Sequence, residues 1–301
     1  MAQSLLEPNL ATLLPSWELA LRAERKAAGT IKAYRDGVVA YLRWCETSST
    51  PAVLDRTAAQ AFVAALLDAG AEAATVHSRL KGLRRFSAWL AEEGEIAGDP
   101  LVGMRSPRID AKVVRALSED QLKRLIKACT GKALMDRRDE ALVRLMAETG
   151  LRASEVVALT TADVDLERGL VTIHRGKGGK GRIVPFGPQT GIAIDRYLRA
   201  RRSHRLAESG QLWVGGGGKT FGYHALHEGL KARAALAGID GFHPHLLRHT
   251  FATRWKAARG TDDGLMAVAG WSSRGMIDRY AGAAAAERAA DEARGLGLGD
   301  L

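Results

Sequence analysis

The sequence predicts a mainly helical α+β protein of two domains, the second of which carries a small antiparallel sheet. Three observations support this: apolar residues recur at spacings of three and four along most of the chain, one short stretch is β-branched, and one segment has no period. The chain has 301 residues, which at roughly 100 to 200 residues per domain makes one large or two ordinary domains. It is therefore long enough to bury its own cores.

Residues 1–104 have the pattern of a helical bundle. Four amphipathic helices are predicted, at residues 10–26, 30–45, 57–69 and 75–93. The stretch 94–114 then contains two Pro, three Gly and no sustained period. We therefore place a linker at residues 105–114.

Residues 115–301 form the second predicted domain. Ser118 and Gln121 make a capping box that opens its first helix, and Gly150 is suited to end the helix at 136–149 in a left-handed conformation. Two β-branched runs flanking a glycine-rich turn predict an antiparallel hairpin, at residues 170–174 and 182–186. Further helices are predicted at residues 190–206, 221–237, 244–258, 262–269 and 273–280, with a tail helix to about residue 294.

The charge balance favours a polyanionic partner. The net charge is +10, and residues 1–110 hold 13 charges of each sign, so the whole excess lies in residues 111–301. Each phosphate that a basic group neutralises releases condensed counterions. No apolar run approaches the ~18 residues of a spanning helix, and the start lacks the pattern of a secretory leader. Cys45 and Cys129 are predicted to be reduced core thiols, which indicates the cytoplasm.

Several residues have the right types and spacing for chemistry. His245 and Arg248 are three apart on a predicted helix and share a face. Arg152 follows a helix stop, and Glu155 is close enough to anchor its guanidinium or to cap the next helix. Each residue alone has a structural alternative, since a lone Arg is usually on the surface, and a lone His or Tyr usually packs. The ordered set is more informative.

Four motifs carry a resemblance to the tyrosine recombinase family, also called the phage integrase family, along nearly the whole chain. They are TGLRASEV at 149–156, RGKGGKGRIVPF at 175–186, HPHLLRHTFAT at 243–253 and AGWSSRGMIDRYAG at 269–282. The resemblance implies six catalytic residues: Arg152, Lys177, His245, Arg248, Trp271 and Tyr280. It also implies a helical core-binding domain at 1–104 that clamps DNA, and a catalytic domain with a C-terminal tail helix at 115–301. The family usually has histidine where this chain has Trp271.

The residue types suit transfer of a phosphodiester. Arg152 and Arg248 would hold the phosphate, because a guanidinium is a permanently charged planar fork. By resemblance, Tyr280 is the nucleophile, His245 assists its proton transfer, and Trp271 supports the site. Lys177 is the predicted general acid, with Lys180 and Arg182 as competitors. One phosphoester replaces another in this scheme, so no cofactor, ATP or metal ion is expected.

Two other patterns are interpreted as structural. WVGGGGKT at 213–220 nearly matches a phosphate-binding loop, but Trp213 stands where that motif requires glycine. His243, His245 and His249 lack a partner Cys or carboxylate at a zinc spacing. The predicted DNA contacts, for which a solvated basic face is the alternative, are Arg79, Lys81, Arg84, Arg85, Lys180 and Arg182.

The sequence thus predicts a site-specific DNA recombinase acting in integration, excision or dimer resolution through a 3′-phosphotyrosyl intermediate. The alternatives are a type IB topoisomerase-like enzyme and a catalytically silent DNA-binding protein on the same scaffold. The resemblance implies double-stranded DNA sites as substrate and a homotetramer, or a pairing with a related recombinase, on two duplexes. Residues 283–294 are suited to dock on a neighbouring subunit. A directionality factor is a further candidate partner, and a membrane is not expected.

Overall fold

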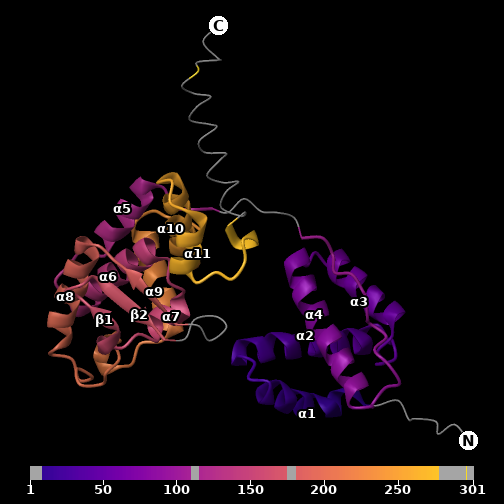
Figure 1. Ribbon diagram of the computed structural model, residues 1–301. Helices are drawn as coiled ribbons and strands as arrows, with labels where there is room; N and C mark the ends of the chain where they lie inside the picture. The colour runs from indigo at the N-terminus through magenta and orange to yellow at the C-terminus, as the bar shows by residue number, and fades with distance from the viewer. Residues whose placement is uncertain (1–8, 110–114, 175–180, 278–295, 297–301) are drawn as a thin grey trace, which may run out of the picture. The chain divides into compact units, whose positions relative to one another are not determined.

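The computed structural model describes residues 9–109, 115–174, 181–277 and 296. The chain divides into two compact units, Met1–Ala111 and Lys112–Leu301, and the division falls inside the predicted linker. Both units are mainly helical, and the described strands form one small antiparallel sheet in the second unit (Figure 1). The predicted fold class is therefore confirmed. None of the described helices is long and apolar enough to cross a membrane.

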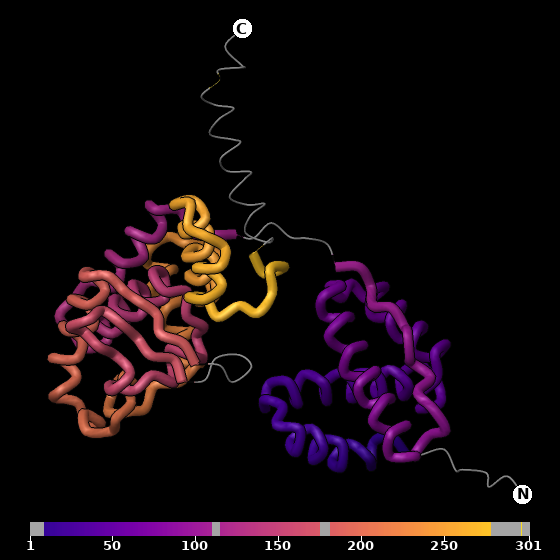
Figure 2. The backbone as a smooth tube through the Cα atoms, in the orientation of Figure 1, coloured from indigo at the N-terminus to yellow at the C-terminus, as the bar shows by residue number. Residues whose placement is uncertain are grey.

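Within residues 9–109 the first unit is a bundle of four helices, all of them predicted. They are α1 (Leu10–Ala23), α2 (Ala28–Thr47), α3 (Arg56–Asp68) and α4 (Ala73–Glu92), which Figure 2 traces from indigo to magenta. Asn9 caps α1 and Asp55 caps α3, because each side chain accepts a hydrogen bond from a backbone N–H of the first turn. The buried core is rich in aromatic rings, including those of Trp17, Tyr41 and Phe86.

The backbones of α2 and α4 touch at two glycines. A Cβ atom at Gly37 would lie 2.4 Å from the carbonyl oxygen of Arg79, and one at Gly82 would lie 2.4 Å from that of Tyr34. Because no carbon atom fits at that distance, only glycine permits this crossing. The crossing fixes how α4 lies on the bundle, and with it the direction in which the basic residues of α4 point.

The described part of the second unit contains seven α-helices: α5 (Glu119–Ala128), α6 (Leu134–Thr149), α7 (Ala153–Val157), α8 (Pro188–Arg201), α9 (Tyr223–Leu236), α10 (His245–Ala257) and α11 (Asp262–Ala269). The predicted capping box is confirmed, since Gln121 N donates to Ser118 Oγ at 3.1 Å and Ser118 N donates to Gln121 Oε1 at 3.0 Å. Gly150 ends α6 with φ 62°, as predicted.

Several helix boundaries differ from prediction by a few residues, and two of these differences have a structural reason. α8 ends at Arg201 and not at residue 206, because the Arg201 guanidinium donates to the carbonyls of Leu206 and Ala207 and holds the chain in a turn. α9 begins at Tyr223 and not at 221, because Gly222 is its N-cap residue and has an extended backbone conformation. The helix predicted at 273–280 is described only to residue 277, with 275–277 helical, and the tail helix lies outside the described residues.

The sheet has the order β1-β2-β3, with β1 (Val164–Asp165), β2 (Leu170–Ile173) and β3 (Arg182–Pro185). β2 and β3 form the predicted antiparallel hairpin, with Val171 opposite Val184 and Ile173 opposite Arg182. Val171, Ile173 and Val184 are buried in the core. β1 was not predicted, because a strand of two residues is too short to show an alternating pattern of apolar and polar residues.

The glycine run after Trp213 belongs to the packing of the second unit. The Trp213 ring is 1% exposed, stacks on Tyr197 with 5.2 Å between ring centroids, and donates from Nε1 to the Val156 carbonyl at 2.9 Å. Gly216–Gly218 form a short 3-10 turn, η2, and the next helix begins only at Tyr223. A phosphate-binding loop would lead directly into a helix N-terminus, so this segment lacks that arrangement.

Candidate active site

Arg152 stands at the junction of α6 and α7. Gly150 is required there twice over, because its φ is positive and a Cβ atom would lie 2.3 Å from the Phe251 ring. Arg152 is the N-cap residue of α7, and its backbone N–H donates to Glu155 Oε2 at 2.9 Å. Its guanidinium Nη1 donates to Glu155 Oε1 at 2.8 Å. Glu155 therefore fulfils both predicted roles, as anchor and as cap.

Arg248 lies on α10 and is 2% exposed. Its Nη1 donates to the Gly150 carbonyl at 2.6 Å and its Nη2 to the Ala269 carbonyl at 2.8 Å. Its Cζ lies 5.2 Å from the centroid of the Trp271 ring. Both carbonyls belong to helix C-terminal ends, where the macrodipole is negative and favours a cation. Arg248 therefore joins the ends of α6 and α11.

The C-terminal end of α11 accepts a hydrogen bond from each of three arginines. The pairs are Arg182 Nε to Val268 O at 2.8 Å, Arg248 Nη2 to Ala269 O at 2.8 Å, and Arg152 Nη2 to Gly270 O at 3.1 Å. The last carbonyls of a helix have no partner within it, so guanidinium donors satisfy them well. Three consecutive carbonyls thus accept from the N-cap residue of α7, from β3 and from α10.

The Glu155 carboxylate lies between two of these arginines. Arg182 donates to both of its oxygens, at 3.0 and 2.8 Å, while Arg152 donates to Oε1. Burial by itself raises the pKa of Glu155, but the hydrogen bonds from Arg182 and Arg152 outweigh it, and the pKa lies below its ordinary value. We call Arg152, Arg182, Arg248 and Glu155 the arginine cluster. With three guanidiniums and one carboxylate it is net positive.

His245 begins α10, one turn before Arg248. Its ring centroid lies 4.4 Å from that of His249 in an edge-to-face arrangement and 6.5 Å from that of His243. Desolvation by the surrounding protein lowers the pKa of His245, and the positive charge of Arg248 lowers it further. Part of the residue nevertheless faces solvent. Among the described residues, no three His, Cys, Asp or Glu side chains are placed to share a metal ion.

The segment that carries Tyr280 starts from this cluster. Gly270 ends α11 with φ 62°, and Trp271 follows it at 6% exposure. Ile277 is buried in the same hydrophobic cluster as Trp271 and Phe251. Tyr280 itself lies outside the described residues, three positions further on. The structure therefore describes the anchoring of this segment as far as Ile277.

The hairpin turn with its two candidate lysines, Lys177 and Lys180, also lies outside the described residues. On the β2 side of the turn, His174 Nε2 lies 2.6 Å from Asp163 Oδ1. On the β3 side, Arg182 turns inward: its side chain is 10% exposed, and Nε, Nη1 and Nη2 all donate hydrogen bonds. The DNA contact predicted for Arg182 would require these bonds to break. Sequence reasoning missed the inward role because its acceptors are distant along the chain.

The basic residues of α4, in the first unit, differ in exposure. Lys81 and Arg85 are exposed and one turn apart, and Lys81 Nζ lies 5.9 Å from the centroid of the Tyr34 ring. Arg84 is half-buried. Arg79 is half-buried where α4 crosses α2. Lys81 and Arg85 are therefore the members of the predicted set that present most side chain to solvent.

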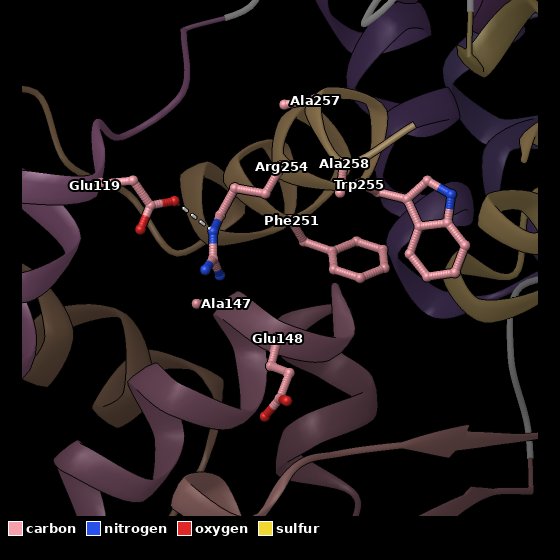
Figure 3. A pocket seen from close by; sticks show the side chains of 8 residues that line it. All are labelled: Glu119, Ala147, Glu148, Phe251, Arg254, Trp255, Ala257 and Ala258. Atoms are coloured by element: carbon pink, nitrogen blue, oxygen red, sulfur yellow. Dashed lines mark hydrogen bonds and ion pairs between the residues drawn. The ribbon is translucent and has the colours of Figure 1, made fainter. Parts of the chain in front are cut away.

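A separate pocket of about 500 Å³ opens on the second unit (Figure 3). The rings of Phe251 and Trp255 line it, and Arg254 donates from Nε to Glu119 Oε1 at 2.6 Å across one side. No member of the arginine cluster lines this pocket. It is therefore distinct from the arginine cluster, although Phe251 comes from the same motif as His245 and Arg248.

Comparison with known proteins identifies both units. Residues 115–287 match the phage integrase family, and residues 14–94 match the phage integrase N-terminal SAM-like domain. Tyrosine recombinase XerC of Xanthomonas campestris pv. campestris strain B100 is 33% identical over 264 residues, which is 86% of this chain and 80% of the relative. Tyrosine recombinase XerD of Ralstonia nicotianae strain ATCC BAA-1114 / GMI1000 is 36% identical over 234 residues, which is 75% of each chain.

The fold is shared with a solved structure. The crystal structure of XerH site-specific recombinase bound to its palindromic difH substrate, a post-cleavage complex, gives a TM-score of 0.69 at 19% identity. The similarity covers 83% of this chain and 75% of that one. With two family models matched in succession and curated relatives above 30% identity over most of its length, this chain belongs to the phage integrase family of tyrosine recombinases.

Proposed function

We propose that this protein is a site-specific DNA recombinase that cuts and rejoins DNA through a 3′-phosphotyrosyl intermediate. The observation that carries the proposal is the convergence of Arg152 and Arg248, from separate elements, on the end of α11. His245 lies one turn from Arg248, and the Trp271 ring lies against the Arg248 guanidinium. Relatives at 33 and 36% identity are named tyrosine recombinases, which supports this assignment.

Arg152 and Arg248 are proposed to hold the scissile phosphate. A phosphodiester gathers negative charge in its pentacoordinate transition state, and donors fixed in advance stabilise that charge without reorganising. Carbonyl and carboxylate acceptors orient both guanidiniums before any DNA binds. A guanidinium has five N–H donors, and the side-chain bonds of Arg152 to Glu155 and Gly270 use two of them.

Tyr280 is the proposed nucleophile. Its phenolic oxygen forms a bond to phosphorus while the bond from phosphorus to the 5′ oxygen breaks. The phenol must lose its proton, and His245 suits this step because its lowered pKa favours the neutral ring that can accept one. Lys177 is proposed to protonate the leaving 5′ oxygen, with Lys180 as the reserve candidate. Attack by a new 5′ hydroxyl reverses the step, so the energy of the phosphoester is conserved.

Trp271 is proposed to support the site and not to transfer protons. An indole has no group that titrates in the relevant range, but its ring can pack on a guanidinium. The Trp271 ring lies 5.2 Å from Arg248 Cζ. It also belongs to the hydrophobic cluster that contains Ile277, so it connects the arginine to the nucleophile segment.

The domains are proposed to divide the work on double-stranded DNA. Residues 1–104 would clamp the duplex, residues 105–114 would link the two domains, and residues 115–301 would cut and rejoin the DNA strands. The exposed Lys81 and Arg85 would contact phosphates on the clamp side, with Arg79, Arg84 and Lys180 as further contacts. We propose a homotetramer, or a mixed assembly with a related recombinase, on two duplexes in the cytoplasm, with a directionality factor as a candidate regulator.

The test is a nicked suicide duplex made from DNA flanking the gene. The wild-type protein should form an SDS-resistant covalent adduct that Tyr280→Phe cannot form, because only the phenol supplies the nucleophile. Two intact duplexes should then yield exchanged junctions. Cleavage and relaxation of a single duplex with no exchange would assign the topoisomerase alternative, and binding without any adduct would assign the silent DNA-binding protein.

A further inference from the structure

We infer that Arg182 is a positioning residue for strand cleavage, the side chain that holds the hairpin, Arg152 and the segment leading to Tyr280 in one arrangement. This inference rests on the proposed function. Arg182 is the first residue of β3, the strand that leaves the hairpin turn. Its Nε donates to the Val268 carbonyl at the end of α11, and its Nη1 and Nη2 donate to the two oxygens of Glu155.

The two acceptor residues, Glu155 in α7 and Val268 in α11, belong to different segments of the site. Glu155 orients Arg152 through a 2.8 Å bond from Nη1 and through the cap of α7. Val268 is three residues before Trp271, in the helix whose end also accepts from Arg248. One guanidinium therefore connects three segments that come from widely separated parts of the chain.

The end of α11 is shaped to admit this side chain. A Cβ atom at Gly270 would lie 2.9 Å from both Cζ and Nη1 of Arg182. The positive φ of Gly270 gives the same residue a second reason to be glycine. With the Arg182 side chain 10% exposed and Glu155 4% exposed, the pair is a buried, bidentate contact. Such contacts give geometric specificity as well as energy.

The consequence for catalysis is alignment. Glu155 Oε1 accepts from both Arg152 and Arg182, so without Arg182 the carboxylate and the guanidinium of Arg152 are free to shift together. A misplacement of about 1 Å can cost about 10²-fold in rate even when the altered residue is remote from the chemistry. Arg182 is thus expected to affect the cleavage rate more than DNA affinity.

The test compares Arg182→Met and Arg182→Lys with wild type in the full chain. DNA affinity is measured by gel shift, and the rate of covalent adduct formation is measured on the suicide duplex at saturating protein. Arg182→Met should cleave about 10²-fold more slowly at nearly unchanged affinity. Arg182→Lys should retain the charge and the fold but cleave at an intermediate rate, because one nitrogen replaces three. Arg199→Gln, which removes an exposed arginine of α8 paired with Asp195, is the matched control and should behave as wild type.

A pH profile separates positioning from simple loss of structure. Burial raises the pKa of Glu155, and Arg182 from β3 and Arg152 from α7 counter it. Removing Arg182 should therefore raise the pKa of Glu155. As the solution is acidified, adduct formation by Arg182→Met should begin to fall at a higher pH than adduct formation by wild type. In a Glu155→Gln background the Arg182→Met change should cause no such shift.

The outcomes are distinguishable. If wild type forms no adduct, the proposed function fails, and this inference fails with it. If wild type forms the adduct and Arg182→Lys cleaves at the wild-type rate, the proposed function stands and the inference is overturned. Parallel loss of DNA affinity and cleavage in Arg182→Met, with the Arg182→Lys rate unchanged, would also overturn it.

Discussion

At the arginine cluster, hydrogen bonds orient the guanidinium groups without neutralising their positive charge. The Arg248 guanidinium donates to the carbonyls of Gly150 and Ala269, which carry only partial negative charge. Glu155 carries a full charge, but Arg152 and Arg182 share it. The cluster therefore presents fixed positive charge that is ready before an anionic substrate arrives, as electrostatic catalysis requires.

The neighbouring histidine should reveal this charge in its titration. Desolvation by the surrounding protein, and next Arg248, lowers the pKa of His245 below its ordinary value, which is about 6.5. NMR titration of the free protein should place the midpoint of His245 below that value, and Arg248→Gln should raise it. His245 then has a lower pKa in the folded protein than in the unfolded chain. Between these two pKa values the unfolded chain binds more protons, so this residue's contribution to stability is lost as the pH falls through that window. A midpoint at or above about 6.5 in wild type would contradict the charge arrangement.

At the scale of elements, the crossing of α2 and α4 is the contact on which the first unit depends. Gly37 and Gly82 each lie against a backbone carbonyl of the opposite helix. Such a contact tolerates no added methyl group, because both partners are backbone and neither can rotate aside. The position of the basic residues on α4 depends on the same contact.

Gly37→Ala should destabilise the protein by about 1 to 3 kcal/mol through overpacking. Gly29→Ala, at the second position of the same helix, is the matched control: nothing lies within 4 Å of its added Cβ, so it should leave the stability within about 0.5 kcal/mol of wild type. Urea unfolding of both variants checks the pair. Equal effects of the two substitutions would show that the crossing is looser than the structure indicates.

At the scale of the whole molecule, the tail after the nucleophile segment is the element proposed to join subunits. A chain truncated after residue 282 should still bind a single DNA site, because the arginine cluster and the first unit are retained. It should lose cooperative binding to paired sites, because residues 283–294 are the proposed docking segment. Gel shifts on one-site and two-site duplexes measure both effects, and recombination at the wild-type rate by the truncated chain would refute the docking role.

The sequence was sufficient for features encoded by neighbouring residues. The capping box of Ser118 and Gln121, the left-handed Gly150 and the hairpin all follow from local spacing, and each is present. The order of the four motifs likewise identified the family. The convergence on α11 could not be predicted, because Arg152 and Gly270 are 118 positions apart in sequence. The glycine crossing of α2 and α4 was missed for the same reason, since helical periodicity does not show which faces meet.

The row of carbonyls at the end of α11 has a consequence for how this protein can vary. Each residue added to or removed from an α-helix turns its end by about 100°. A single insertion within Asp262–Ala269 would move the three carbonyl oxygens away from the arginine side chains that donate to them, and would point Trp271 away from Arg248. Natural variants of this protein should therefore keep the length of α11 constant, while insertions and deletions accumulate elsewhere on the surface.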